Sequence, residues 1–103
     1  MKWNWSGGWN LDDFSKAITS AVDYTLAEDE KTPFISCVFS AASKALTLGL
    51  GDGDVMFVAN IGGSNAVTVK AITGDTGTSV AAGKVAICIG STTANASKIY
   101  ILN

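Results

Sequence analysis

Four apolar runs lie in the middle of the chain, over residues 44–50, 55–60, 66–70 and 83–90, and in three of them the large apolar residues occupy every second position. A period of two places every second side chain on the same face of a pleated strand, so each run predicts a β-strand. Glycine-rich stretches separate the runs, and glycine readily adopts the positive φ angles of tight turns. Short strands at about ten-residue spacing are typical of a small antiparallel β-sandwich or a jelly-roll-like barrel. The alternating apolar sets are Leu46, Leu48 and Leu50; Val67 and Val69; and Val85, Ile87 and Ile89.

The same period extends the predicted β-structure in both directions. Residues 22–26 and 34–40 read as two further strands joined by a charged turn, and residues 98–102 read as a last strand. We therefore expect a mainly β protein in which one β-sandwich domain spans residues 22–103. The apolar face of the strand at 34–40 is predicted to consist of Ile35, Cys37 and Phe39.

The first 21 residues form a separate N-terminal arm in this prediction. All three tryptophans of the chain, Trp3, Trp5 and Trp9, lie in its first ten residues. Residues 10–22 can form one short helix, because apolar side chains recur at helical spacing after a capping asparagine and two aspartates. β-Branched residues weaken the second half of that helix.

Two uses of the tryptophan-rich segment follow from its sequence. It is too short and too interrupted by glycine to make a core of its own, so it either folds back to cap the sandwich or projects and anchors into a partner. Tryptophan dominates the binding energy of many interfaces because it buries a large rigid surface. We therefore favour Trp3, Trp5 and Trp9 as partner-binding residues.

The composition indicates a surface that is covered in part by other molecules. Hydrophobic residues make up 48% of the chain and charged residues only 16%, whereas soluble monomers expose few large apolar patches. We expect a homo-oligomer or another protein partner. No run is long enough for a membrane span, and the N-terminus does not have the pattern of a secretory signal.

The residue types that are missing argue against catalysis and nucleic-acid binding. The chain has no arginine and no histidine, and its lysines are scattered. Arginine is the preferred reader of phosphates and guanine edges, and histidine is the usual general base and the commonest zinc ligand. We expect no enzyme activity, no cofactor, no metal and no nucleic-acid partner.

Three features resemble parts of functional sites, and each has a simpler structural interpretation. The Gly51-Asp-Gly-Asp54 sequence has carboxylates for a calcium loop but reads better as a hairpin turn. The acidic residues around 28–30 lie in one exposed turn, with nothing to place two of them across a cleft. Cys37 and Cys88 each lie in an apolar run and are expected to be buried free thiols, although neighbouring strands would also permit a disulfide.

Residues 22–90 resemble a β-structured module of tailed-bacteriophage virion proteins, which include capsid decoration proteins, head fibres and tail fibres. The resemblance rests on residues 24–40, on residues 58–70, whose hairpin pattern ends in Val67-Thr-Val-Lys70, and on residues 74–90, in which the Gly83-Lys84 pair precedes an apolar strand. It covers about two-thirds of the chain and consists of strands and turns, without a catalytic signature. The tryptophan-rich start is not part of the recurring module.

The resemblance implies a structural role in a virion. The expected function is that of a bacteriophage virion structural protein, a capsid decoration protein or head-fibre base that is assembled in the host cytoplasm and stabilises the particle. Its expected partners are the major capsid protein or another virion protein and further copies of itself, with a trimer favoured. The alternative is a receptor- or glycan-binding module of a tail fibre, which would use polar loops such as residues 91–97.

Overall fold

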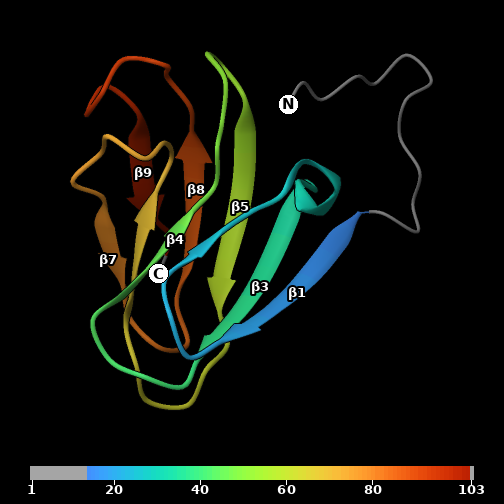
Figure 1. Ribbon diagram of the computed structural model, residues 1–103, viewed down its shortest axis with the longest axis vertical. Helices are drawn as coiled ribbons and strands as arrows, with labels where there is room; N and C mark the ends of the chain where they lie inside the picture. The colour runs from blue at the N-terminus through green and yellow to red at the C-terminus, as the bar shows by residue number, and fades with distance from the viewer. Residues whose placement is uncertain (1–13, 103) are drawn as a thin grey trace.

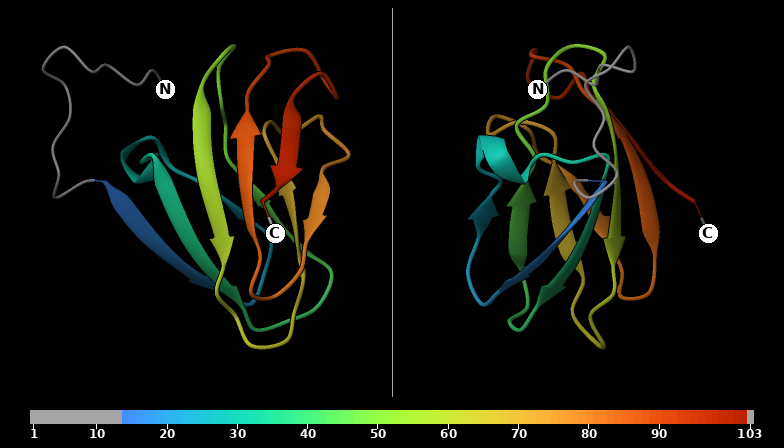
Figure 2. Two further views of the ribbon diagram at one scale, coloured as in Figure 1. Left: turned by 180° about the vertical axis from the view of Figure 1, so that it is seen from behind. Right: turned by 90° about the vertical axis from the view of Figure 1, so that its right-hand side faces the viewer.

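The computed structural model describes residues 14–102, which form nine strands and one short 3-10 turn (Figure 1). The strands are short, and the loops that join them lie at the two ends of the molecule (Figure 2). No helix in this part of the chain is long and apolar enough to cross a membrane. The strands are β1 (Ser15–Ser20), β2 (Tyr24–Thr25), β3 (Phe34–Phe39), β4 (Lys44–Thr47), β5 (Val55–Asn60), β6 (Val67–Lys70), β7 (Thr78–Val80), β8 (Val85–Ile89) and β9 (Lys98–Ile101), and the 3-10 turn is η2 (Glu28–Glu30).

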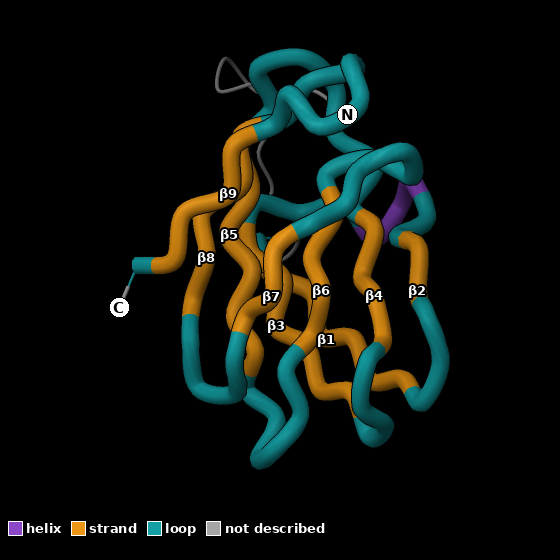
Figure 3. The backbone as a smooth tube through the Cα atoms, turned by 90° about the vertical axis from the view of Figure 1, so that its left-hand side faces the viewer, coloured by secondary structure: helices purple, strands orange, loops and turns teal. Residues whose placement is uncertain are grey.

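The strands form two sheets that pack face to face, so the prediction of a small β-sandwich is confirmed. One sheet has five strands in the order β1-β3-β5-β8-β9, and the other has four in the order β2-β4-β6-β7. Figure 3 views the molecule from the side on which β2, β4 and β6 lie next to one another. Apolar side chains from both sheets fill the space between them, as is usual for a sandwich.

The pairing of the strands is mixed, which corrects the prediction of an antiparallel arrangement. From β1 to β6 the chain crosses from one sheet to the other after every strand, so successive strands of the same sheet run in the same direction. The pairs β1–β3, β3–β5, β2–β4 and β4–β6 are therefore parallel. Only β5–β8, β6–β7 and β8–β9 are antiparallel among the described strands.

The core follows the predicted alternation in most of the strands. In β3, the side chains of Ile35, Cys37 and Phe39 are buried and those between them are half-buried. Val67 and Val69 of β6 are buried in the same way. Alternation thus identified the inner face of these strands correctly.

The predicted helix over residues 10–22 is wrong for the part that the structure describes. Residues Ser15–Ser20 form strand β1, which pairs in parallel with β3 at the edge of the five-stranded sheet. Ile18 and Thr19 favour an extended backbone, and burial of Ile18 against the core stabilises the strand. The described sandwich therefore begins at Ser15, before the expected domain start at residue 22.

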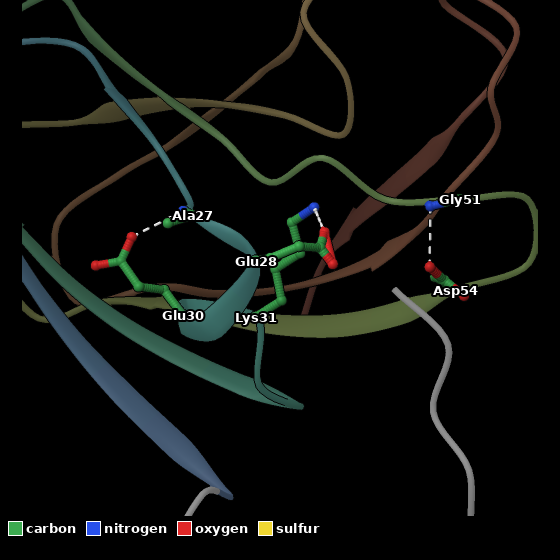
Figure 4. Close-up of polar contacts among 6 residues, drawn as sticks. All are labelled: Ala27, Glu28, Glu30, Lys31, Gly51 and Asp54. Atoms are coloured by element: carbon green, nitrogen blue, oxygen red, sulfur yellow. Dashed lines mark hydrogen bonds and ion pairs between the residues drawn. The ribbon is translucent and has the colours of Figure 1, made fainter.

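The Gly51–Asp54 segment is a turn, as expected, but it is not a hairpin. It connects β4 and β5, which belong to different sheets. The Asp54 amide donates a hydrogen bond to the Gly51 carbonyl oxygen (3.1 Å), and the Gly51 amide donates one to Asp54 Oδ2 (2.9 Å; Figure 4). Gly53 has a φ of 77°, the left-handed backbone that favours glycine at such a position.

Candidate interaction surface

The five-stranded sheet carries apolar side chains on both of its faces. In β8, the inner face consists of Ala86 and Cys88, which are fully buried. The predicted set Val85, Ile87 and Ile89 does share one face, but that face points away from the core. Ile89 is 37% exposed, and the other two are half-buried by their neighbours.

We call the side of this sheet that faces away from the core the outer face. Neighbouring strands bring its residues into register in rows that run across the sheet. The central row joins Ser15 to Phe34, Phe57, Ile87 and Tyr100. Three aromatic rings and one isoleucine thus form a continuous apolar band from β3 to β9. By strand alternation, the outer face also includes Ala17 and Thr19 of β1, Ser36 and Val38 of β3, Val55 and Ala59 of β5, Val85 and Ile89 of β8, and Lys98 of β9.

The outer surface of the four-stranded sheet is more polar. Its register rows place Ala45, Thr68 and Ser79 side by side, and Thr25, Thr47 and Lys70 in the next row. Hydroxyl groups and a lysine are ordinary for a sheet face in water. Among the outer-face residues named in the preceding paragraph, Lys98 is the single charged one. It lies on the edge strand β9. The strands β5 and β8 of this sheet are apolar on both faces over residues 55–59 and 85–89, a pattern typical of strands that are covered on both sides.

The carboxylates near η2 act within the fold. Glu28 pairs with Lys31 (2.5 Å), and Glu30 accepts hydrogen bonds from the Tyr24 hydroxyl (2.5 Å) and the Ala27 amide (2.8 Å; Figure 4). The hydrogen bond from Lys31 lowers the pKa of Glu28, and the hydrogen bond from Tyr24 lowers the pKa of Glu30. These groups are ionised, paired and solvated, and they do not form an acid–base pair across a cleft.

The two cysteines are buried and unreactive in character. Both are free thiols, as expected, and both lie between the sheets. Desolvation raises the pKa of Cys37 to about 11 and that of Cys88 to about 12. The thiolate is the nucleophilic form of cysteine, so neither group has the character of a catalytic nucleophile. Residues 14–102 also hold no cluster of three or more side chains suited to bind a metal ion.

The polar loops at one end of the sandwich are held together by aspartates. Asp75 Oδ1 accepts a hydrogen bond from the Asn95 amide (2.6 Å), and Asn95 Oδ1 accepts one from the Thr76 amide (2.7 Å). Asp52 similarly accepts hydrogen bonds from the amide (2.7 Å) and the hydroxyl (3.1 Å) of Thr92, which lower its pKa. Asp75, Asn95 and their neighbours line an open polar hollow of about 160 Å³. These contacts give residues 91–97 a defined shape.

The predicted anchors and the apolar surface come from different parts of the chain. Trp3, Trp5 and Trp9 lie outside the described residues. Alternation alone does not predict the outer face, because a period of two identifies only one apolar face of a strand. The signal was nevertheless present: residues 55–59 and 85–89 are apolar at every position, which is the pattern of strands covered on both faces.

Comparison of the chain with protein-family models, with curated proteins and with solved structures finds no match.

Proposed function

We propose that this chain is a structural protein of a tailed-bacteriophage virion, either a capsid decoration protein or the base of a head fibre. The observation that carries the proposal is the apolar outer face, which is suited to association with other proteins. The phage assignment itself is supported by the resemblance of residues 22–90 to virion modules. The proposed partners are the major capsid protein or another virion protein, together with further copies of the chain in a trimer.

The proposed mechanism is mechanical. Particle stabilisation results from burying apolar surface between this protein and the shell, and it needs no catalytic group. Trp3, Trp5 and Trp9 are the proposed anchors. One buried tryptophan removes about 150–250 Å² from water, which is worth roughly 4–6 kcal/mol before the cost of association is subtracted.

The test is co-sedimentation of the purified protein with particles that lack it. We expect the wild-type chain to sediment with the particles and the Trp3→Ala/Trp5→Ala/Trp9→Ala variant to remain in the supernatant. Val22→Ala serves as the control, because Val22 is exposed in a bend between β1 and β2, outside the proposed contacts. Circular dichroism must show that all three proteins are folded. Equal sedimentation of the triple variant and wild type would refute the role of the tryptophans.

The alternative function is receptor or glycan binding at the tip of a tail fibre. The polar hollow beside Asp75 and Asn95 favours it, because its hydrogen-bonding groups are held in place by neighbouring loops. Retention of the protein on host cells or on a glycan column would support this alternative. Loss of that retention in Asn95→Ala, with Thr25→Ala on the polar sheet as control, would assign it to the hollow.

A further inference from the structure

We infer that the free protein forms a two-fold symmetric dimer in which strand β9 pairs antiparallel with β9 of a second copy. The two five-stranded sheets then join edge to edge into one continuous sheet. This dimer is a property of the isolated chain and does not depend on the phage assignment. Its contact is also separate from the trimer proposed above.

The edges of the two sheets are formed by four strands, and β9 is the one best suited to accept a further strand. β2 and β7 are only two and three residues long, and β1 is mostly polar and includes Lys16. Short edge strands and lysines on an edge discourage pairing with another chain. In β9 the lysine stands at the first position, and Tyr100, Ile101 and Leu102 follow with exposures of 54%, 41% and 52%. An exposed apolar edge of this kind is typical of a strand that pairs with another chain.

The backbone groups of Ile99 and Ile101 point away from their own sheet. The Leu102 amide donates a hydrogen bond to the Val85 carbonyl oxygen (2.8 Å), which makes these two residues a hydrogen-bonded pair of the β8–β9 ladder. Such pairs alternate along antiparallel strands, so Ile99 and Ile101 do not bond to β8. Within residues 14–102, no strand lies beyond β9. The amides and carbonyls of these two residues are therefore directed to a place where a second strand can pair with them.

A second copy of β9 matches this edge. When the two-fold axis passes between Tyr100 and its symmetry mate, Ile99 of each strand lies opposite Ile101 of the other. Each of these pairs exchanges two hydrogen bonds, so four hydrogen bonds use the outward amides and carbonyls of both strands. The two tyrosines are neighbours on the outer face, and Lys98 lies opposite Leu102, about 14 Å along the strand from the second lysine. Like charges are thus kept apart while apolar side chains meet.

The contact is small, so the dimer should dissociate on dilution. Five paired residues span about 17 Å, whereas a stable interface usually buries about 800 Å² on each partner. The pairing nevertheless places both outer faces on the same side of one sheet. Each face measures about 19 by 20 Å, so the dimer presents about 800 Å², as much as one partner contributes to an interface of standard size.

Sedimentation equilibrium of the full chain, from about 1 μM to about 1 mM, measures the association. Wild type should pass from monomer to dimer as the concentration rises. Ile101→Pro removes one outward amide from each copy, and hence two of the four hydrogen bonds, so the dissociation constant should rise about tenfold or more. Proline is tolerated on an edge strand where the missing amide faces outward. Ile101→Val keeps the amide and should associate like wild type, and circular dichroism must show that all three proteins are folded.

Oxidative cross-linking tests the register without the use of proline. Tyr100 and its symmetry mate form a non-hydrogen-bonded pair with Cα atoms about 4.5 Å apart, so Tyr100→Cys should form an intermolecular disulfide. Lys98→Cys is the control, because its mate is about 14 Å away along the strand and a disulfide cannot span that distance. Cys37 and Cys88 are fully buried and should not take part.

Three results would overturn the inference. One is the mass of a single chain at every concentration up to about 1 mM. Another is a dimer or trimer whose dissociation constant is unchanged by Ile101→Pro, which would assign the association to another surface. The third is equal cross-linking of Tyr100→Cys and Lys98→Cys. Co-sedimentation with particles tests the proposed function separately, so either proposal can fail while the other survives.

Discussion

Asn60 connects the two sheets, and its replacement is predicted to be costly. It is the last residue of β5 and is only 1% exposed. Its Nδ2 donates hydrogen bonds to the carbonyl oxygens of Val80 in β7 (2.9 Å) and Asn65 (2.8 Å). Its Oδ1 accepts one from the Gly62 amide (3.2 Å). One buried amide thus links the five-stranded sheet, the four-stranded sheet and the connection between β5 and β6.

The expected loss for Asn60→Ala follows from these three hydrogen bonds. The Val80 carbonyl lies in a buried contact, and removing the partner of such a group costs about 1–3 kcal/mol. The other two hydrogen bonds are only partly buried, and water replaces part of their energy. We expect a total loss of about 3 kcal/mol in the free energy of unfolding. For a domain of this size, that loss corresponds to a decrease of roughly 12–24 °C in Tm.

Urea unfolding followed by circular dichroism measures this loss, and Asn65→Ala is the matched control. Asn65 Nδ2 makes a single, partly buried hydrogen bond to the Phe39 carbonyl oxygen (2.9 Å). Its loss should cost about 1 kcal/mol. If Asn60→Ala costs no more than Asn65→Ala, then Asn60 does not link the sheets energetically and the reasoning is refuted.

Three further predictions concern buried thiols, acid stability and a turn. Cys37 and Cys88, with pKa values raised to about 11 and 12, should react with a thiol reagent at pH 8 only after unfolding; rapid labelling of the native protein would contradict their burial. The pKa of Glu30 is lowered in the folded state, so the ionised carboxylate stabilises the fold. This contribution to the free energy of unfolding should be fully present above the usual carboxyl pKa and should be lost as the pH falls through the lowered pKa of the folded state. Thermal unfolding of wild type and Glu30→Gln against pH measures this, and the two curves should converge in acid. Gly77→Ala should cost more than Gly53→Ala in urea unfolding, because both have positive φ (86° and 77°) but a Cβ at Gly77 would lie 2.7 Å from a side-chain carbon. Equal losses of about 1–2 kcal/mol would show that backbone strain alone accounts for both.

The strands and their inner faces were largely predictable from the sequence, because burial between two sheets imposes a period of two. Ile35, Cys37 and Phe39 illustrate this in β3. In β8 the same rule selected Val85, Ile87 and Ile89, which lie on the outer face, because every position of that strand is apolar. Periodicity alone cannot separate two faces that are both apolar.

The order and direction of the strands could not be derived from local pattern. Turn signals show where a strand ends, but they do not show whether the next strand joins the same sheet. Here the chain changes sheets at the Gly51–Asp54 turn, so the expected hairpin is absent and parallel pairs result. The apolar residues of β1 have helical spacing, and for this reason a helix was predicted there. The prediction is wrong because pairing with β3, a contact distant in sequence, outweighs that local pattern.

The proposed virion assignment is tested most directly by mass spectrometry of gradient-purified particles, made from any phage whose genome is found to encode the chain. The proposal predicts that the protein is present in the intact particles in many copies. Chemical cross-linking of the same particles should join it to the major capsid protein or to another protein of the head. Absence of the chain from purified particles, with the protein recovered only from the soluble lysate, would contradict a structural role in the virion.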